Sequence, residues 1–333
     1  MGVRLYYVKL PTVQFGALPF KLFRAFFTLM NIRMLVRKIN PDILHAHFIS
    51  GVAFFGALSG FRPFVVSAWG SDILIGAKRS RLRRFIVKYV LKKADLITCD
   101  AEHMREAMRR LGATPKKISI VNFGVDTRKF SPKRRSEKLR KKLGIHNSPT
   151  VISLRNLEPL YDVETFIKSI PMVLKEVPET KFVIAGRGSE EMRLKKLAKS
   201  LDVSDSISFV GWIPHDKLPR YLASADVYVS TSLSEGGISV STLEAMACEL
   251  APVVTEVGDN TKWIKNGENG FVVAPSDLDE LAEKIIYLLK RETIRKEFGK
   301  KNRRIVKERA EYENEMTKME NLYNELTGGI STI

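Results

Sequence analysis

Residues 227–257 read VYVSTSLSEGGISVSTLEAMACELAPVVTEV and combine an apolar run, a glycine-bearing turn and a helix-favouring segment. Apolar residues 227–229 predict a buried strand, and residues 235–237 indicate the turn that follows it. Ser241 and Thr242 then precede the run from Leu243 to Cys248, which favours a helix. The first turn of a helix offers unpaired N–H groups and the positive end of the helix dipole. The stretch therefore predicts an anion-binding site.

Two carboxylates, Glu235 and Glu244, flank the predicted start of this helix. Carboxylates close to a phosphate site could hold sugar hydroxyls rather than the phosphate itself. The alternative is an ordinary turn acid and a helix-start acid favoured by the dipole. We expect Glu244 to lie at the helix start and outside the core.

Residues 234–254, SEGGISVSTLEAMACELAPVV, resemble the donor-site signature of the family-4 retaining glycosyltransferases, which have the two-domain GT-B fold. The resemblance implies that Glu244 binds the nucleotide ribose and that the helix N-terminus faces the donor diphosphate. It implies that Glu235 meets the transferred sugar, together with the amides of Gly236 and Gly237. At the helix start it assigns donor binding to Ser241, Thr242 and Leu243.

The match departs from the family at two positions. Eight residues separate the two acids where the family usually has seven, so either a bulge re-aims Glu235 or Gly236 occupies its place. Glu249 stands where the family generally has Gly, which caps the C-terminus of a helix. We expect that second change to affect only the helix end.

Further donor candidates follow from the same resemblance and from the residues themselves. In the family an Arg, and usually a Lys, clamp the diphosphate; SLRNLEPLYDV supplies Arg155, while Tyr161 stands at the Lys position. Arg grips phosphate with a planar fork, although a surface arginine at a strand end is the alternative. Gly186 and Gly188 would permit close approach of a nucleotide, and Trp212 would touch the base or pack.

The first part of the chain departs more from the family. PDILHAHF and PFVVSAWGSDIL resemble two acceptor-domain strands with their loops, and Trp69 replaces a family His that contacts the transferred sugar. The acceptor-side candidates are Trp69, Gly70, Asp72 and His47. A structural histidine remains an alternative for His47 and for His45. Residues 3–8 match a later family strand, so we expect the usual first βα unit with its Gly-rich loop to be missing.

Alternating strand and helix patterns predict two parallel-sheet, Rossmann-like α/β domains facing across a cleft, the first of them abbreviated. In the first, residues 43–47, 64–68, 96–99 and 118–121 read as strands. Expected boundaries are 1–130 for the acceptor-side domain, 131–149 for a linker, 150–290 for the donor domain and 291–333 for C-terminal helices. These last helices are expected to pack back toward the N-terminal domain.

Positive charge is concentrated at the start of the chain. The net charge is +18, and residues 1–130 carry 23 Lys or Arg against 7 Asp or Glu. Such asymmetry indicates attraction to nucleic acid, anionic lipid or a phosphorylated substrate. The basic part lacks zinc-finger, helix-turn-helix and RNP signatures, which leaves nucleic-acid binding as a remote alternative.

The first 38 residues hold seven bases, no acid and many aromatic residues. Charge interrupts the apolar residues too often for a membrane span or for the core of a signal peptide. Residues 15–38 predict a basic amphipathic helix in the interface of an anionic membrane. This would place the protein in the cytoplasm, peripheral to the inner face of the cell membrane. A core helix with a basic edge is the alternative.

The predicted function is sugar transfer from a nucleotide-sugar, such as a UDP- or GDP-sugar, to a hydroxyl of a glycan or lipid-linked acceptor. The resemblance implies retention at the anomeric carbon, no metal, and a role in polysaccharide or glycolipid biosynthesis. Asp277 and Asp279 form the one D-x-D, which is better explained by helix capping than by metal binding. A non-catalytic or partner-dependent GT-B protein remains an alternative, motivated by the missing first unit, Trp69, Tyr161 and the shifted Glu235.

Overall fold

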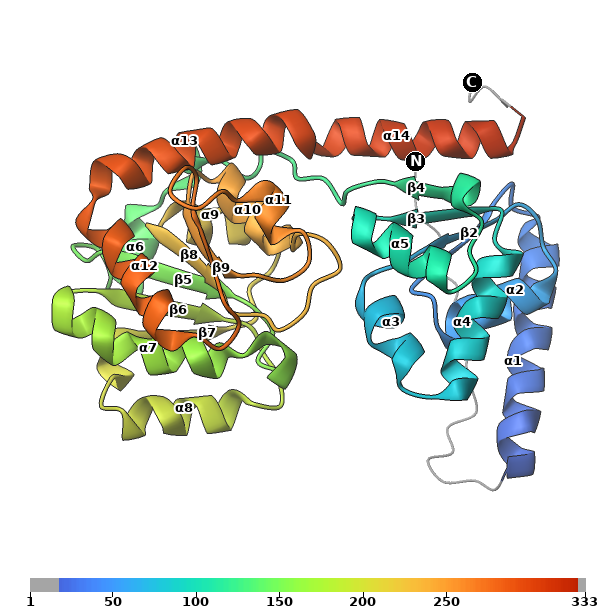
Figure 1. Ribbon diagram of the computed structural model, residues 1–333, viewed down its shortest axis with the longest axis horizontal. Helices are drawn as coiled ribbons and strands as arrows, with labels where there is room; N and C mark the ends of the chain where they lie inside the picture. The colour runs from blue at the N-terminus through green and yellow to red at the C-terminus, as the bar shows by residue number, and fades with distance from the viewer. Residues whose placement is uncertain (1–17, 329–333) are drawn as a thin grey trace. The chain divides into compact units, whose positions relative to one another are not determined.

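The computed structural model describes residues 18–328, which divide into two compact units (Figure 1). Unit 1 comprises Met1–Val121 and Lys318–Ile333, and unit 2 comprises Asn122–Thr317. Residues 3–8, where the sequence suggests a later family strand, lie outside the described residues.

Unit 1 is built on a parallel sheet with the strand order β1-β2-β3-β4. Its strands are β1 (Leu44–His47), β2 (Phe64–Ser67), β3 (Leu96–Cys99) and β4 (Ile118–Ile120). Its helices are α1 (Leu18–Ile39), α2 (Gly51–Ser59), α3 (Ser71–Leu74), η1 (Gly76–Lys78), α4 (Arg81–Lys93), α5 (Glu102–Arg110) and η2 (Pro115–Lys117). The central strands are almost wholly apolar, as expected for a parallel sheet covered on both faces.

Unit 2 contains a parallel sheet with the order β10-β9-β8-β5-β6-β7. Its strands are β5 (Thr150–Leu154), β6 (Lys181–Ala185), β7 (Ile207–Gly211), β8 (Val227–Ser230), β9 (Ala251–Thr255) and β10 (Phe271–Val273). Strands added after β5 extend the sheet first in one direction and then, from β8, in the other. The point of reversal lies between β5 and β8, where open α/β sheets bind ligands at the carboxyl ends of their strands.

Helices cover both faces of this second sheet (Figure 1). They are η3 (Pro132–Arg134), α6 (Glu137–Lys142), η4 (Pro159–Tyr161), α7 (Val163–Glu176), α8 (Glu191–Ser200), η5 (Ser204–Ser206), α9 (Leu218–Ala223), α10 (Val240–Ala247), α11 (Asn260–Trp263), α12 (Leu278–Lys290) and α13 (Glu292–Arg309). One apolar cluster includes α7 and α12, and a second includes α10. The last helix, α14 (Tyr312–Leu326), begins in unit 2 and ends in unit 1.

The predicted α/β class with two parallel-sheet domains is confirmed, and the strand predictions agree to within one residue. The segment predicted as a linker folds differently. Residues 131–149 contain α6 and belong to unit 2, and the two units divide between Val121 and Asn122. Charge and proline make this segment resemble a linker, but its charge has a structural use.

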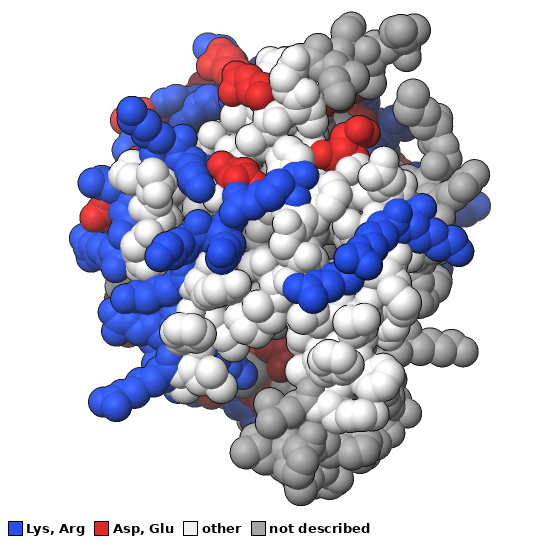
Figure 2. Space-filling view, turned by 90° about the vertical axis from the view of Figure 1, so that its right-hand side faces the viewer, with Lys and Arg blue, Asp and Glu red and all other residues white. Residues whose placement is uncertain are grey.

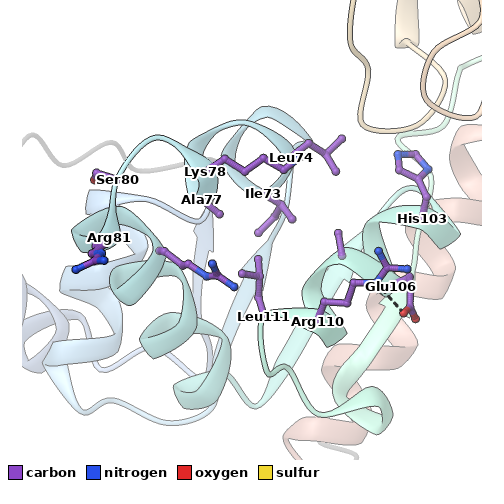
Figure 3. A pocket seen from close by; sticks show the side chains of 12 residues that line it. Ile73, Leu74, Ala77, Lys78, Ser80, Arg81, His103, Glu106, Arg110 and Leu111 are labelled. Carbon is purple, nitrogen blue, oxygen red and sulfur yellow. Dashed lines mark hydrogen bonds and ion pairs between the residues drawn. The ribbon is translucent and has the colours of Figure 1, made fainter.

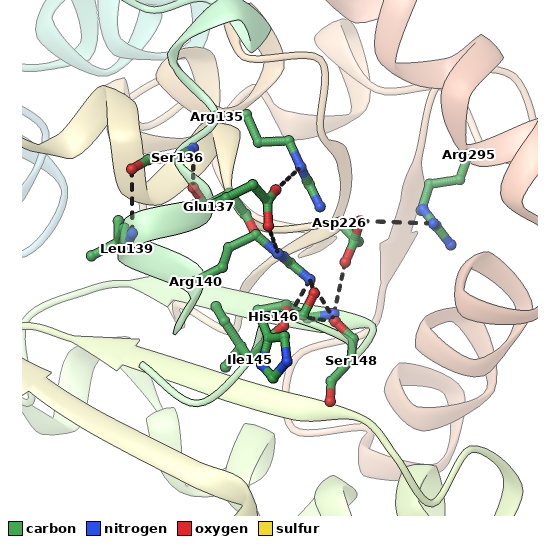
Figure 4. A network of polar contacts seen from close by, with 12 residues as sticks. Arg135, Ser136, Glu137, Leu139, Arg140, Ile145, His146, Ser148, Asp226 and Arg295 are labelled. Atoms are coloured by element: carbon green, nitrogen blue, oxygen red, sulfur yellow. Dashed lines mark hydrogen bonds and ion pairs between the residues drawn. The ribbon is translucent and has the colours of Figure 1, made fainter. Parts of the chain in front are cut away.

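That use is centred on Arg140, which is buried in α6 (Figure 4). Its guanidinium donates to the carbonyl oxygens of Ile145 at 2.7 Å and Ser148 at 3.0 Å, and also to that of Ser224. Asp226 accepts from the backbone N–H of Thr150 at 2.8 Å. The buried guanidinium binds several carbonyls at once, two within the segment and one at the C-cap of α9, so it fixes the segment to the rest of unit 2.

The end of α10 explains the departure at Glu249. Glu249 has a φ of +65°, in the left-handed region that favours glycine. A Cβ at Gly299 would come within 2.1 Å of the Glu249 carbonyl oxygen, so α13 packs directly on this turn. As expected, the change from Gly is confined to the C-terminus of the helix, where a side chain costs about 1 kcal/mol.

Replacing Glu249 with glycine is therefore expected to raise the free energy of unfolding by about 0.5–1 kcal/mol. Urea denaturation followed by circular dichroism measures the change. Glu297→Gly, at an exposed position inside α13, is the matched control and should lower stability by about 1 kcal/mol. A Glu249→Gly variant less stable than the wild type would contradict the assignment of strain to this residue.

The helix predicted near the N-terminus is present as α1 and has 22 residues. It contacts α2, and the Arg33 side chain donates to the carbonyl of Leu58 at 2.9 Å. Phe23, Phe26, Met30 and Met34 are exposed, at spacings that place them along one face of the helix. Within the described residues, no helix is both long enough and apolar enough to cross a membrane.

Candidate active site

The candidate site lies at the carboxyl ends of β5 and β8, the strands between which the order of the sheet reverses. β5 ends before Arg155, and β8 leads into the loop of residues 231–239. The loop is held by Thr231, which donates to the carbonyl of Asp162 at 2.8 Å, and by Thr255, which donates to that of Ser232 at 2.5 Å. The loop is therefore fixed to the start of α7 and to the end of β9 before any ligand binds.

The loop ends at Ser239, the N-cap of α10. The Ser239 hydroxyl accepts from the backbone N–H of Thr242 at 3.2 Å. Ser241 and Thr242 consequently lie inside the first turn, where the sequence suggested that they precede the helix, and Leu243 follows them. The backbone N–H groups of Val240 and Ser241 have no acceptor within residues 18–328. They are the groups that a helix N-terminus offers to an anion.

Arg155 reaches from the end of β5 to this helix start. Its Nη1 donates to Ser241 Oγ at 3.2 Å, and its Nη2 forms an ion pair with Glu235. The guanidinium lies 4.4 Å from the ring centre of Tyr161, which packs against it as a cation–π partner. The side chains of Arg155 and Glu235 are 10% and 14% exposed, so the surface-arginine alternative does not describe Arg155.

The spacing between the two acids has a structural counterpart. With eight intervening residues, Glu235 is directed onto Arg155, so in this state its carboxylate neutralises the proposed diphosphate clamp. Gly258 packs closely on this loop, because a Cβ there would lie 2.2 Å from the Gly237 carbonyl oxygen and 2.9 Å from the Cβ of Glu235. Gly236 lies between these two contacts in the same loop. Gly258 is a site residue that the sequence reasoning missed.

Glu244 lies on α10 and is only 4% exposed. The expectation that it lies outside the core was wrong, because the first turns of α10, which carry Glu244, are buried in unit 2. Burial raises the pKa of the Glu244 carboxyl, and the hydrogen bond from His215 opposes that rise. Such a carboxylate loses solvation on folding, so any further hydrogen-bond donor stabilises its ionised form strongly.

His215 and Lys129 complete the surroundings of Glu244. His215 Nε2 lies 2.9 Å from Glu244 Oε1, and Lys129 Nζ lies 2.9 Å from His215 Nδ1. Lysine can only donate, so Nδ1 accepts and Nε2 carries the proton that is donated to the carboxylate. Neither residue was predicted; Pro214 next to His215 indicates only a loop, and the fold brings Lys129 in from 86 residues away.

The other donor candidates lie at the ends of β6 and β7. Gly186 has a φ of +140°, and a Cβ there would lie 2.1 Å from the Arg155 carbonyl oxygen. A Cβ at Gly188 would lie 2.1 Å from the carbonyl oxygen of Leu157. These glycines allow the loop after β6 to pack on the loop after β5, which is a reason other than nucleotide contact. Trp212 is 63% exposed, so packing does not account for its ring.

In unit 1, the acceptor-side candidates lie at the carboxyl ends of β1 and β2. The exposed rings of His47 and Trp69 meet edge to face, with centres 6.0 Å apart. Gly70 begins α3 with a φ of +100°. Asp72 is buried, and its carboxylate accepts from the backbone N–H groups of Ile49 at 2.7 Å and Trp69 at 3.1 Å. Asp72 therefore joins two loops, and burial raises its pKa.

His45 lies on the same strand but is fully engaged. Its Nδ1 lies 2.6 Å from the Tyr323 hydroxyl and its Nε2 lies 2.8 Å from Ser67 Oγ. Burial, together with the neighbouring His47, lowers the pKa of His45 to about 4. It is neutral at physiological pH, in agreement with the structural role that the sequence left open.

Among residues 18–328 no three His, Cys, Asp or Glu side chains form a group that could hold a metal ion. Asp277 is the N-cap of α12 and accepts from the backbone N–H of Glu280 at 2.9 Å, so the capping interpretation of the D-x-D is confirmed. Cys99 and Cys248 are both free and buried.

Comparison with known proteins supplies the family. Residues 135–305 match the glycosyl transferases group 1 family, and residues 7–101 match the glycosyl transferase 4-like family. The chain belongs to the group 1 glycosyl transferases. The predicted resemblance and the predicted class of enzyme, a hexose-transferring glycosyltransferase, are both confirmed.

Curated relatives of this glycosyltransferase are similar over most of its length. It is 26% identical to an N-acetyl-alpha-D-glucosaminyl L-malate synthase of Bacillus anthracis, over 86% of this chain and 75% of the relative. It is 27% identical to a GDP-mannose-dependent alpha-(1-6)-phosphatidylinositol monomannoside mannosyltransferase of Mycolicibacterium smegmatis, over 69% of this chain. The matched region spans 62% of that relative, which is less than two thirds of its length.

The fold of the glycosyltransferase matches solved structures more completely. Anabaena HepE in complex with UDP aligns with a TM-score of 0.79 at 20% identity, over 90% of this chain and 82% of HepE. The predicted GT-B fold is thereby confirmed.

Proposed function

We propose that this protein transfers a sugar from a nucleotide-sugar to a hydroxyl of a glycan or lipid-linked acceptor, with retention at the anomeric carbon and without a metal. The observation that carries the proposal is the convergence of Arg155, the first turn of α10 and the buried Glu244 at one switch point of a parallel sheet.

Each part of the site has a chemical task in this proposal. The guanidinium of Arg155 and the backbone N–H groups at the start of α10 stabilise the charge that develops on the departing diphosphate. Glu244 accepts a hydrogen bond from a ribose hydroxyl, and Trp212 offers an exposed ring to the base. The relatives' names support both substrates, because one uses GDP-mannose and a phosphatidylinositol glycolipid, and HepE binds UDP.

A donor screen tests the proposal. Purified protein with EDTA is given UDP- and GDP-sugars with glycan and glycolipid acceptors, and the release of nucleoside diphosphate is measured. We expect one nucleotide class to support acceptor-dependent release in the presence of EDTA. Calorimetry that detects no binding of any nucleotide-sugar or nucleoside diphosphate would contradict the assigned donor site.

A second candidate function is a partner-dependent glycosyltransferase, favoured by the ion pair that occupies Arg155 and by Tyr161 at the expected Lys position. Nucleotide binding without turnover in the donor screen, followed by turnover when cell extract is added, would support it over the first.

We also propose that unit 1 docks on the inner face of the cell membrane. α2 contacts both α1 and α4. The exposed large apolar residues of these three helices are Phe23, Phe26, Phe27, Met30, Met34, Ile39, Val52, Leu82 and Phe85. Figure 2 shows uncharged surface on this side of the unit, with many Lys and Arg residues at the left of the view and others crossing its middle and right. Apolar side chains next to bases are the pattern of an interfacial protein surface.

Met34→Ser is expected to weaken binding to anionic vesicles about fivefold, because a methionine of which about half is exposed contributes roughly 1 kcal/mol on burial. Co-sedimentation with phosphatidylcholine vesicles, with and without phosphatidylglycerol, measures it. Met192→Ser, at an exposed methionine of α8 in unit 2, is the matched control and should bind as the wild type does. Equal binding to neutral and anionic vesicles, or to neither, would contradict the docking proposal.

A further inference from the structure

Unit 1 contains an open cavity of about 810 Å³ that the donor site does not explain. It lies between the segment of α3 and η1, the start of α4, and α5 (Figure 3). Every residue that lines it belongs to unit 1, whereas Arg155 and Glu244 belong to unit 2. Its volume is typical of a pocket for a small-molecule ligand.

One part of the cavity wall is apolar. Ile73 and Ala77 are buried members of the core of unit 1, and Leu74, Ala107 and Leu111 pack against that core. Figure 3 shows Ile73, Ala77 and Leu111 facing the space between α4 and α5. An apolar ligand group in contact with them would gain about 25 cal/mol for each Å² removed from water.

The rest of the wall is strongly cationic. Lys78, Arg81, Arg84 and Arg110 line the cavity together with one carboxylate, Glu106. Glu106 is shared by two arginines, with Arg110 Nε at 3.2 Å and Arg109 Nη1 at 3.0 Å. Lys78, Arg81 and Arg84 form no ion pair within the described residues. Three cations around an apolar wall therefore lack a counter-charge.

We propose that this cavity binds the phosphate of an alkyl- or prenyl-phosphate lipid, with the phosphate on Lys78, Arg81 and Arg84 and the hydrocarbon on the apolar wall. Guanidinium groups match phosphate oxygens with a planar fork, and lysine adds a point charge. Identifying this lipid as the lipid-linked acceptor rests on the proposed function; binding of the lipid phosphate itself does not.

The apolar and cationic walls together favour a lipid phosphate over other small ligands. A sugar phosphate or inorganic phosphate would leave the apolar wall in water, and a neutral lipid would leave the three cations without a partner. α4 also carries the exposed residues Leu82 and Phe85, next in sequence to the arginines that line the cavity. A chain that leaves the cavity along α4 would therefore remain in contact with apolar side chains.

Calorimetry with octyl phosphate, kept below its critical micelle concentration, tests the proposal on the full-length protein without a membrane or a sugar donor. Octyl glucoside supplies the same chain with an uncharged head, and inorganic phosphate supplies the anion without the chain. We expect octyl phosphate to bind at least about tenfold more tightly than either, because it alone satisfies both walls.

Two variants and a control localise the binding. Arg81→Gln with Arg84→Gln should weaken octyl phosphate binding by about tenfold or more, since two charged hydrogen bonds are lost. Arg83→Gln with Lys88→Gln removes the same charge from exposed positions of α4 that do not line the cavity, and should leave binding within about twofold. Ala107→Phe fills the cavity without changing its charge and should also weaken binding.

All variants are checked for folding by thermal denaturation, and the double arginine variant decides the matter if Ala107→Phe does not fold. Equal losses in the two charge-matched variants would overturn the proposal in favour of general surface attraction. Binding of inorganic phosphate as tightly as octyl phosphate, or no binding of octyl phosphate, would also overturn it. Nucleoside diphosphate affinity, measured in the same variants, reports on unit 2 and so tests the proposed function separately.

Discussion

Replacing Arg155 with alanine is expected to weaken nucleoside diphosphate binding by about 1.5–3 kcal/mol, the usual contribution of a hydrogen bond to a charged group. This corresponds to a Kd raised roughly 10- to 150-fold. The reason is positional: Arg155 follows β5, touches Ser241 in the first turn of α10 and rests on Tyr161. Calorimetric titration of UDP and GDP into the wild type and the variant measures the change.

Pyrophosphate is the decisive second ligand for this variant. It carries the diphosphate without ribose or base, so Arg155→Ala should weaken its binding by a similar factor. Arg155→Lys retains the charge but loses the planar fork, and should give an intermediate affinity. An Arg155→Ala protein that binds pyrophosphate as the wild type does would remove Arg155 from the diphosphate site.

The ion pair between Arg155 and Glu235 predicts a variant that binds nucleoside diphosphate more tightly than the wild type does. A diphosphate must compete with Glu235 for the guanidinium, because both side chains are largely buried and face each other. Glu235→Gln removes the competing charge and is expected to tighten binding of the free nucleoside diphosphate severalfold. If Glu235 also meets the transferred sugar, sugar transfer should fall in the same variant.

Short-range signals in the sequence predicted the sheets well. Short runs with β-branched residues, such as those of β3 and β5, favour buried strands when helix patterns alternate with them. Asp277 could be assigned as a cap because its helix follows at once. Arg155 and Glu244 were identified from the family resemblance, and the fold places both beside the switch point that the strand order of unit 2 shows.

The remaining features depend on contacts between residues far apart in the chain. Lys129 meets His215 across 86 residues, and no local pattern indicates that pairing. Arg140 lies in a charged segment that resembles a linker, and only the carbonyls of Ile145, Ser148 and Ser224 show why its charge is buried. Asp72 likewise resembles an available ligand until its carboxylate is seen to hold the loops after β1 and β2.

Replacing Glu244 with glutamine is expected to weaken nucleoside diphosphate binding by about 1.5–3 kcal/mol while leaving pyrophosphate binding unchanged. Glutamine has the same shape but offers a neutral acceptor to the ribose hydroxyl. It also keeps a partner for His215, so the buried turn should remain packed. Both Arg155→Ala and Glu244→Gln should therefore weaken the binding of UDP or GDP, but only Arg155→Ala should weaken the binding of pyrophosphate. This difference separates the diphosphate contact from the ribose contact.

The pH dependence of binding gives Glu244 an independent signature. Burial raises its carboxyl pKa above the ordinary value of 4.5, and only the ionised form is a full acceptor for the ribose. Nucleoside diphosphate affinity should therefore fall as the pH is lowered toward and through this raised pKa. The same titration of Glu244→Gln, which has no carboxyl at this position, should lack that fall.

The raised pKa of Glu244 should also make the free energy of unfolding depend on pH. When folding raises the pKa of a carboxyl, the group stabilises the fold at pH values below its pKa in the unfolded chain. That contribution is lost as the pH rises through its pKa in the folded protein. The free energy of unfolding is measured by urea denaturation of Glu244→Gln and of the wild type at pH 4 and at pH 7. The value for the variant minus that for the wild type should be larger at pH 7 than at pH 4. A constant difference between the two proteins across that range, together with unchanged UDP and GDP affinity, would remove Glu244 from the donor site and leave it as a buried structural acid of α10.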